Sequence, residues 1–243
     1  MKTVVIIPTY NERENIGKLI NLLEEEFARI PNHEMSILVI DGNSPDGTAE
    51  AVRQVQQKWG NIHLLIEEEK KGLGAASVQA MNFAMKDLGA EIVATIDGDL
   101  SHDPRDLKRL LAAVDQGADF VIGSRYVRGG SIPADWGPHR KLLSFFGNMV
   151  ARVLGVWGVH DHTPAFRAIR VDRVLSRVVL DETMPSGYAF QVALVCRAHD
   201  LGAKLAEVPV HFEDRTKGKS KMPPGNIFET LGFLLKYRIG KVL

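Results

Sequence analysis

Residues 92–99 read Ile-Val-Ala-Thr-Ile-Asp-Gly-Asp, a run of apolar and β-branched residues that ends in two carboxylates. An unbroken run of this kind is typical of a strand buried on both faces of a parallel sheet. Open α/β sheets bind their ligands at the carboxyl ends of the strands, which is where Asp97 and Asp99 fall. Because residues two apart on an extended backbone point the same way, we expect these carboxylates to converge.

Two converging carboxylates offer the oxygen ligands that a hard divalent cation such as Mg²⁺ or Mn²⁺ prefers. A cation held by only two carboxylates keeps other positions open, and these commonly take the diphosphate of a substrate. We therefore interpret Asp97 and Asp99 as a metal and diphosphate site, and the chain as a candidate for nucleotide-sugar chemistry.

The composition is that of an ordinary globular protein. The chain has 243 residues, of which 45% are hydrophobic and 25% charged, and this suits one large domain. Its formal net charge is zero, so no global field recruits nucleic acid and we expect no nucleic-acid partner. The single cysteine, Cys196, lies in an apolar run and excludes an internal disulfide. With no signal peptide and no apolar run long enough to span a bilayer, we expect a cytoplasmic protein.

Short apolar runs alternate with helix-period segments along the first half of the chain. We expect strands at residues 4–7, 37–40, 64–66, 92–96 and 120–122, and helices at residues 16–27, 49–58, 75–88 and 107–116. Pro104 is expected to open the last of these helices, with Asp103 as its N-cap. This alternation predicts βαβ units and hence an α/β fold, with a mostly parallel central sheet and helices on both faces.

The pattern of expected elements changes in the second half of the chain, which we interpret as an elaboration of the first half. We expect a helix at residues 140–154, a strand at 166–169, a helix at 188–199, a strand at 205–210 and a loop at 211–224. Residues 227–243 have helical period, and this helix either packs on its own domain or lies at a membrane interface. Its apolar stripe consists of Ile227, Phe228, Leu231, Leu234 and Leu235.

Polar, turn-forming segments follow the first two expected strands. Residues 8–12, Pro-Thr-Tyr-Asn-Glu, supply an aromatic ring that can stack on a base and a carboxylate that can bond a base or a ribose. Residues 41–48, Asp-Gly-Asn-Ser-Pro-Asp-Gly-Thr, begin with Asp41, which can accept a hydrogen bond from a base N–H. Taken alone, each segment is more simply explained as a strand-to-helix turn, with Asn11 capping the first helix and Asp46 or Thr48 the second.

Residues 71–77, Lys-Gly-Leu-Gly-Ala-Ala-Ser, nearly match the dinucleotide fingerprint, but Ser77 stands at its third position. The fingerprint also expects a strand that runs straight into the first glycine, whereas residues 67–71 are a charged run. The segment therefore argues against a Rossmann dehydrogenase.

Taken together and in this order, the segments resemble those of the polyprenyl-phosphate (dolichol-phosphate) mannose synthases of glycosyltransferase family 2. The matching stretches are PTYNERENI, DGNSPDGT, KGLGAA, IDGDLSHDP, GSRY, DHTPAFR, GYAFQ and VPVHFEDRTKGKSK, in unbroken order between residues 3 and 221. Each motif is weak by itself, but the ordered set is specific. The resemblance implies a GT-A fold and the inverting transfer of mannose from GDP-mannose to a polyprenyl (dolichyl) phosphate.

The resemblance also implies roles for individual residues. The nucleoside contacts would be Pro8, Tyr10, Glu12 and Asp41, and Asp97 and Asp99 would hold Mg²⁺ or Mn²⁺ together with the donor diphosphate. The catalytic set would be Asp99 with the phosphate-binding Arg125 and Arg140, while Arg215 and Lys221 would lie on an acceptor-side loop. 

A lipid acceptor implies a protein peripheral to the cytoplasmic face of a membrane. Residues 1–224 would form the catalytic domain and residues 225–243 an amphipathic helix that contacts the lipid surface. A separate membrane-anchoring subunit is the open alternative for this contact.

The chemistry of the reaction fits these roles. A phosphate monoester has a second pKa of about 6, so the nucleophile is already anionic and needs no strong general base. The reaction needs cations that hold two negative groups together, and guanidinium forks suit phosphate geometry. The candidates are Arg125, Arg140, Arg167 and Arg215, although a surface ion pair is the default role for any single arginine.

Two positions depart from the family pattern. The sequence Asp41-Gly42-Asn43-Ser44 stands where the family usually reads DDGS, so the second acidic residue is missing and the choice between GDP and UDP stays open. Ala193 stands where the family usually has a Glu, which weakens any assignment of a donor-sugar contact or a base there. The alternative with the same fold is transfer of glucose or another sugar from a UDP-sugar to polyprenyl phosphate.

Other classes of protein fit less well. A haloacid-dehalogenase-type phosphatase also carries Asp-x-Asp after a strand, but after its first strand, whereas two βα units precede it here. A non-catalytic membrane-associated binding subunit would explain Gly42 and Ala193, but not the retained acidic pair and Arg125. Residues 160–162, His-Asp-His, are not interpreted as a metal cluster, because adjacent side chains diverge and no further ligand has suitable spacing.

Overall fold

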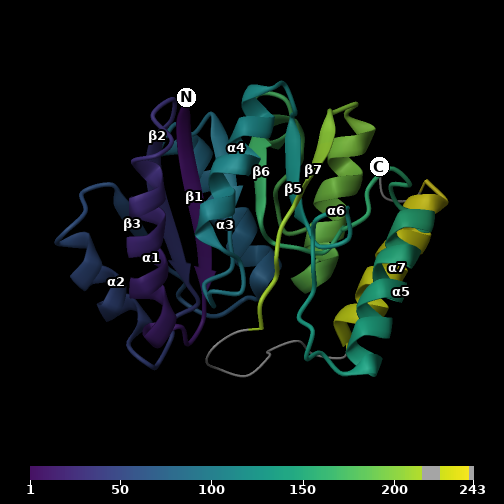
Figure 1. Cartoon of the computed structure of the whole chain (residues 1–243), viewed down its shortest axis with the longest axis horizontal. Helices are drawn as coiled ribbons and strands as arrows, with labels where there is room; N and C mark the ends of the chain where they lie inside the picture. Colours follow the sequence, from purple (N-terminus) through teal and green to yellow (C-terminus); the bar gives the residue numbers. More distant parts are fainter. Residues whose placement is uncertain (215–224, 241–243) are drawn as a thin grey trace.

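The centre of the protein is a seven-stranded sheet with helices on both faces; the computed structural model describes residues 1–214 and 225–240 (Figure 1). The strand order is β3-β2-β1-β4-β6-β5-β7. Neighbouring strands are parallel except at β6, which runs antiparallel to both β4 and β5. The expected mostly parallel α/β sheet is confirmed. The strands are β1 (Lys2–Thr9), β2 (Glu34–Asp41), β3 (Ile62–Ile66), β4 (Ile92–Thr95), β5 (Phe120–Ser124), β6 (Arg167–Arg170) and β7 (Leu205–Pro209).

The helices form a layer on each face of this sheet. Helices α1 (Arg13–Phe27), α2 (Thr48–Gln56) and α4 (Leu107–Asp115) cover one face, and α3 (Leu73–Lys86) and α6 (Gly187–Asp200) cover the other. Helix α7 (Gly225–Arg238) packs on α6, and α5 (Pro138–Leu154) packs on α7, so these two lie side by side at one end of the molecule (Figure 1). Two short 3₁₀ turns, η1 (Pro104–Asp106) and η2 (Leu175–Arg177), complete the described elements.

The alternation of side chains along β1 divides the core in two. Val4 and Ile6 face the cluster under α3 and α6, whereas Val5 and Ile7 face the cluster under α1, α2 and α4. All four are buried, so a shift of register by one residue would turn each set to the wrong face. Register along β1 is fixed by eight residue pairs with β2 and four with β4, and it aligns the carboxyl ends of these strands at one edge.

The residues that begin the helices agree with expectation at one of three places. The Asp103 carboxylate accepts from the Arg105 N–H (3.0 Å) at η1, which leads into α4. The expectation that Asp46 or Thr48 caps α2 is wrong, because Gly47 is the N-cap residue; Asp46, one position earlier, accepts from the Thr48 N–H (3.0 Å). The expectation that Asn11 caps α1 is wrong. Glu12 is the N-cap residue, and Asn11 takes a left-handed φ of 56°, held by a hydrogen bond to the Ser44 hydroxyl (2.9 Å) from the neighbouring loop.

Helix α7 packs on its own domain through one face and leaves the other uncovered. Phe233 and Leu234 are buried, and the Tyr237 hydroxyl donates to Asp200 on α6 (2.6 Å). Among the residues that the structure describes, no helix combines the length and the hydropathy needed to cross a bilayer. The uncovered apolar residues of α7 are Phe228, Leu231 and Leu235.

Leu19 on the inner face of α1 has no exposed surface, whereas Leu143 on α5 is 53% exposed. We expect Leu19→Ala to lower the free energy of unfolding by about 2–5 kcal/mol, because it removes buried contacts and leaves a cavity. The matched control, Leu143→Ala, should change it by no more than about 0.5 kcal/mol. Urea unfolding followed by circular dichroism measures both, and equal losses would contradict the layer arrangement.

Candidate active site

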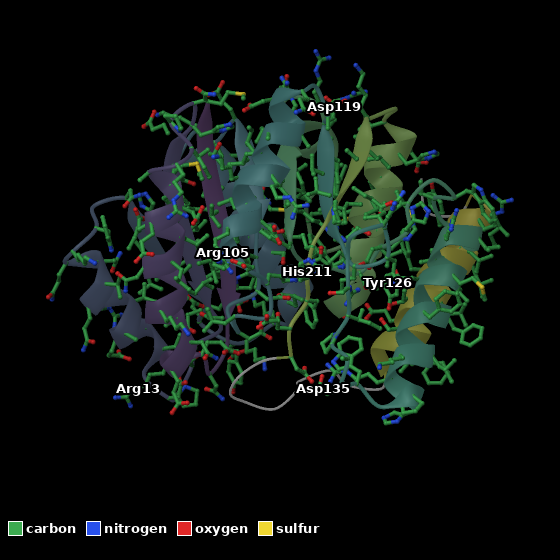
Figure 2. All side chains as sticks on the ribbon, viewed as in Figure 1. Arg13, Arg105, Asp119, Tyr126, Asp135 and His211 are labelled. Carbon is green, nitrogen blue, oxygen red and sulfur yellow. The ribbon has the colours of Figure 1, made fainter. Side chains whose placement is uncertain are left out.

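The loop that follows β4 lies against the end of β1. A Cβ added to Gly98 would lie 3.2 Å from Thr9 Cγ2 and 3.5 Å from the Pro8 carbonyl oxygen. A side chain between the two aspartates would therefore crowd the end of β1, which explains the glycine. The end of β1 and the loop after β4 both lie at the carboxyl edge of the sheet. In Figure 2, Arg13 at the start of α1 marks this edge, and Asp119, which precedes β5, marks the opposite edge.

Asp97 and Asp99 border the same buried imidazole. Asp97 Oδ2 lies 3.9 Å from His102 Nε2, and Asp99 acts electrostatically on the same ring. Asp99 is buried, and its Oδ1 accepts hydrogen bonds from the N–H and the hydroxyl of Ser101 (3.1 and 2.6 Å). The Asp97 side chain is 36% exposed. Both carboxylates therefore act on the His102 ring.

The donor set at this loop suits a hard divalent cation. Burial lowers the pKa of His102 to about 4, and Arg125 acts in the same direction, so the imidazole is neutral at pH 7 and brings no positive charge. Within residues 1–214 and 225–240, no group of three or more His, Cys, Asp or Glu side chains is arranged to hold a metal ion. Asp97 and Asp99 offer carboxylate oxygens, which Mg²⁺ and Mn²⁺ prefer, and substrate and solvent would have to supply the other ligands.

The residues expected to contact the nucleoside gather where β1 and β2 end in register. The Lys70 ammonium lies 3.4 Å from the centroid of the Tyr10 ring, an arrangement that a cation–π attraction favours. Glu12 occupies the N-cap position of α1, and Pro8 is partly exposed. The structure thus brings Pro8, Tyr10 and Glu12 together next to the loop after β4.

Asp41 belongs to the same group but is fully buried. Its Oδ1 accepts from the hydroxyls of Thr9 (2.9 Å) and Ser44 (2.6 Å), and its Oδ2 accepts from the Ser44 N–H (2.8 Å). These bonds tie the turn after β2 to the end of β1. The carboxylate is therefore engaged by the protein itself, and its contact with a base stays a prediction.

Arg125 forms a buried ion pair with Asp161. Its Nε and Nη2 donate to the two carboxylate oxygens (both 2.8 Å), and Nη2 also donates to the Thr163 hydroxyl (2.7 Å). The two side chains are 9% and 0% exposed. Burial acts to raise the pKa of Asp161, but the adjacent guanidinium outweighs it and holds that pKa below its ordinary value of 3.8. Arg125 is thus committed to an internal carboxylate, and its contact with a phosphate stays a prediction.

Arg167, expected among the phosphate-binding arginines, is instead buried inside the protein. It begins β6, is fully buried, and donates to the carbonyl oxygens of Pro164 (2.8 Å), His162 (2.7 Å) and Gln191 (2.8 Å). Burial lowers its pKa to about 9. Counting Arg167 among the phosphate-binding arginines is therefore wrong, because its side chain has no surface from which to reach a substrate.

Arg140, near the start of α5, lies between an aromatic ring and a carboxylate. Its Cζ is 3.9 Å from the centroid of Trp136, and its Nη1 and Nη2 donate to Asp214 (2.9 and 3.2 Å). Both members of the ion pair are more than a third exposed. Unlike Arg125, Arg140 can therefore exchange its carboxylate for another anion at low cost.

The segment after β7 runs beside the loop that carries Asp99. The Glu213 N–H donates to the Ser101 carbonyl (3.0 Å), and the ring of Phe212 packs against that of His102 with centroids 5.1 Å apart. Figure 2 labels His211 at the start of this segment. The segment that leads to the predicted acceptor-side loop thus begins next to the loop of the two carboxylates.

Some contacts between side chains at the site were not predicted from the sequence. The pairing of Asp161 with Arg125 joins residues 36 apart and leaves no periodic signal. Trp136, four residues before Arg140, was missed, although an aromatic at that spacing is a usable sign of stacking. Residues 160–162 diverge as expected, since His160 Nδ1 lies 2.8 Å from Glu207 while Asp161 faces Arg125. Arg215 and Lys221 lie outside the described residues.

Sequence comparison identifies related proteins. A family model described as Glycosyl transferase family 2 matches residues 4–175. The polyprenol monophosphomannose synthase of Mycolicibacterium smegmatis is 38% identical over 231 residues, which are 95% of this chain and 84% of the relative. The undecaprenyl-phosphate mannosyltransferase of Micrococcus luteus is 36% identical over 95% of this chain and 91% of its own. The dolichol-phosphate mannosyltransferase of Pyrococcus furiosus is 34% identical over 99% of this chain and 64% of its own.

Solved structures share the architecture at low sequence identity. A mannosyltransferase from Pyrobaculum calidifontis, in complex with GDP-Man and Mn²⁺, has a TM-score of 0.62 and 20% identity over 97% of this chain and 69% of its own. TarS from S. aureus, in complex with UDP-GlcNAc, has a TM-score of 0.65 and 19% identity over 100% of this chain and 67% of its own. At these identities the likeness shows the fold alone, and it confirms the expected GT-A architecture.

Removing the charge of Asp161 should be costly, because it leaves the Arg125 guanidinium buried without a partner. We expect Asp161→Asn to lower the free energy of unfolding at pH 7 by about 3–5 kcal/mol. Since the pKa of Asp161 is lowered on folding, its contribution is present above pH 3.8 and is lost as the pH falls through the folded-state pKa. Urea unfolding at pH 7 and at pH 3 should show a smaller acid loss in the variant than in the wild type.

The matched control for this experiment is Asp172→Asn, which removes an exposed carboxylate paired with Arg170. Exposed pairs contribute about 0–1 kcal/mol, so this variant should remain close to the wild type. A loss of equal size in the two variants would contradict the special position of the Arg125–Asp161 pair.

Proposed function

The chain belongs to glycosyltransferase family 2, and on this basis we propose that it transfers mannose from GDP-mannose to a polyprenyl (dolichyl) phosphate, with inversion at the anomeric carbon. The observation that carries the proposal is the position of Asp97 and Asp99 against the end of β1, where the nucleoside contacts are expected. The names of the three relatives, which refer to polyprenol, undecaprenyl-phosphate and dolichol-phosphate mannose, support this substrate pair.

The donor would lie along the carboxyl edge of the sheet. Asp97 and Asp99 would hold Mg²⁺ or Mn²⁺, which when bound offsets the charge that develops on the leaving diphosphate. Tyr10 offers its ring to the base, and Glu12 offers a carboxylate to the ribose hydroxyls. Pro8 and Glu12 both lie beside Gly98 in the loop after β4, so the nucleoside and diphosphate sites would be adjacent.

The acceptor phosphate acts as the nucleophile. One of its oxygens bonds to C1 of mannose while the bond from C1 to the GDP oxygen breaks, and GDP leaves with the electron pair. Because a phosphate monoester is already anionic near pH 7, with a second pKa of about 6, no side chain has to remove a proton. The task of the protein is to hold the acceptor phosphate close to the donor diphosphate in spite of their like charge.

The described arginines contribute unequally to this task. Arg140 presents an exposed fork that can release Asp214 and bond the acceptor phosphate bidentately. Arg125 adds positive charge beside His102 while it stays paired with Asp161. Arg215 and Lys221 complete the proposed acceptor side from the segment outside the described residues.

A UDP-sugar donor is the second candidate for the same reaction, and the observation that favours it is Gly42, which removes one acid from the nucleoside side. Separate incubations with polyprenyl phosphate, Mn²⁺ and either GDP-mannose or UDP-glucose distinguish the two donors. The two glycolipids have equal mass, so the incubation in which glycolipid forms identifies the donor. We expect mannolipid from GDP-mannose; glucolipid alone would replace the donor in the proposal.

The carboxylate pair predicts a sharp loss of turnover. We expect Asp99→Asn to lower the rate of mannolipid formation by about 100-fold or more, because the charge that offsets the leaving diphosphate would no longer be held. Radiolabelled GDP-mannose with Mn²⁺ and a short polyprenyl phosphate measures the rate. The control is Asp103→Asn, in the same loop, which keeps a capping side chain and should retain nearly full activity. Full activity of Asp99→Asn would refute the proposed metal role.

A second surface bears on the lipid acceptor. We name as the α5–α7 face the apolar side chains of these two adjacent helices that are at least 40% exposed (Figure 1). Helix α5 contains no acidic residue, and Lys141 and Arg152 accompany its apolar side chains. The face consists of Leu142, Leu143, Phe145, Phe146, Met149 and Val153 on α5, and Phe228, Leu231 and Leu235 on α7.

We propose that this face rests on a membrane surface. Apolar helix faces flanked by lysine and arginine bind the interface of anionic lipids, and nine exposed apolar side chains on two adjacent helices exceed the scattered exposure of ordinary monomers. Arg140 lies on α5 itself, so contact of α5 with lipid would bring the acceptor phosphate to its guanidinium. In this proposal helix α7 (Gly225–Arg238) is the amphipathic element that supplements the catalytic domain of residues 1–224, and a separate anchoring subunit is not needed.

Polar substitutions on this face should weaken membrane binding. We expect Phe145→Ser together with Phe146→Ser to lower co-sedimentation with phosphatidylcholine–phosphatidylglycerol vesicles by about tenfold or more, because two aromatic rings no longer enter the lipid. Val179→Ser, at an exposed apolar residue outside the face, is the control and should bind as the wild type does. Absence of vesicle binding by the wild-type chain would instead favour a protein subunit as the occupant of this face.

A further inference from the structure

Glu67 is a buried acid at the nucleoside side of the site. It follows β3 directly, and its N–H donates to the Asp41 carbonyl (2.9 Å), which extends the pairing of β3 with β2. A Cβ added to Gly42 would lie 3.4 Å from Glu67 Oε2. The carboxylate of Glu67 therefore lies beside the position where the family usually has its second acid.

The space above Gly42 is bounded by three kinds of group. The same Cβ position lies 3.4 Å from Tyr10 Cδ2 and 3.5 Å from Lys70 Cγ, in addition to the Glu67 oxygen. An aromatic ring and a carboxylate oxygen thus meet at one point, which is the combination that a planar base with N–H donors needs. Since Tyr10 is already expected to stack on the base, Glu67 lies within reach of the edge of that base.

Asp41 and Glu67 differ in their exposed fractions and in the hydrogen bonds that their carboxylates accept from the protein. Asp41 accepts three hydrogen bonds from Thr9 and Ser44 and has no exposed surface. Glu67 is 5% exposed. Burial raises the pKa of Glu67 and the neighbouring Asp41 adds to the rise, while a hydrogen bond from the Lys71 N–H and the charges of Lys71 and Lys70 act against it. Donors from a ligand would stabilise this carboxylate at a place where a second negative charge is costly.

We propose that Glu67 determines the specificity for the base by accepting the N1–H and 2-amino N–H of a guanine. This inference rests on the proposed function, and it would decide between GDP and UDP as the donor nucleotide. Guanine presents two adjacent donors to a carboxylate, whereas uracil presents one N–H between two carbonyl oxygens that a carboxylate repels. The loss of the acid at Gly42 is thus compensated by an acid from the next strand.

The test compares GDP, inosine diphosphate and UDP, each with Mn²⁺, by isothermal titration calorimetry on the full chain. Inosine diphosphate lacks the 2-amino group but keeps N1–H. We expect the wild type to bind GDP about tenfold or more tightly than either other nucleotide. Glu67→Gln should lose most of this preference, because its amide offers one acceptor and a repelling N–H₂ group. The control Glu69→Gln, at an exposed acid two residues on, should keep the preference.

The outcomes separate this inference from the function on which it rests. If the wild type prefers GDP and Glu67→Gln keeps the full preference, the role of Glu67 is refuted and the proposed function stands. If the wild type binds UDP more tightly, or binds no nucleotide, the GDP donor and the role of Glu67 are both refuted. Should Glu67→Gln not fold, Glu67→Asp keeps the charge but retracts the carboxylate by one methylene, and retention of the full preference by that variant would overturn the inference.

Discussion

The geometry of the candidate site depends on the buried ion pair between Arg125 and Asp161. Removing two charges from water costs several kcal/mol per ion, and the cost is met only when the charges match each other closely. Here both guanidinium–carboxylate contacts are 2.8 Å, and the Arg125 N–H adds a third bond to the same carboxylate. The pair joins the end of β5 to the loop before β6, and it lies beside His102, which borders Asp97 and Asp99. Separating the end of β5 from the loop before β6 would leave a buried charge unpaired, so the ion pair holds these two segments together.

Most of the fold was predictable because its signals are local. Apolar runs such as residues 92–96 identify buried strands, and their alternation with amphipathic helices leads to a parallel sheet. What the sequence did not reveal is the position of β6, which enters the sheet antiparallel between β4 and β5. Strand order depends on contacts between distant segments, and no pattern within residues 167–170 records which neighbours that strand will have. The cap of α1 failed for a similar reason, since Ser44 from another loop fixes the turn at Asn11.

The sequence predicted which strand ends would lie together, but not the hydrogen-bond and ion-pair partners of the individual side chains. The placement of polar residues after strands correctly brought the end of β1 and the loop of Asp97 to one edge. Only the structure shows the partners of the individual side chains. Arg167 donates to three carbonyl oxygens, Arg125 pairs with Asp161, and Asp41 accepts from Thr9 and Ser44. Motif positions cannot distinguish an arginine that meets a substrate from one that holds a loop, because both occupy the same place in the sequence. Glu67 carried no signal of its own, since a charged run is usually a solvated surface.

The antiparallel insertion of β6 also governs the order in which a growing chain can complete its sheet. Residues 92–95 of β4 are fully buried in the finished protein, yet their outer partner, β6, begins 72 residues after the end of β4 in the chain. Until residues 167–170 have left the ribosome, β4 presents an open, apolar edge of the kind that recruits strands from other molecules. Strand β4 is therefore completed only after a long stretch of chain has been made, and β5 waits longer still, for β7 at Leu205–Pro209. Biosynthesis, rather than catalysis, is the stage at which this sheet is most exposed to aggregation.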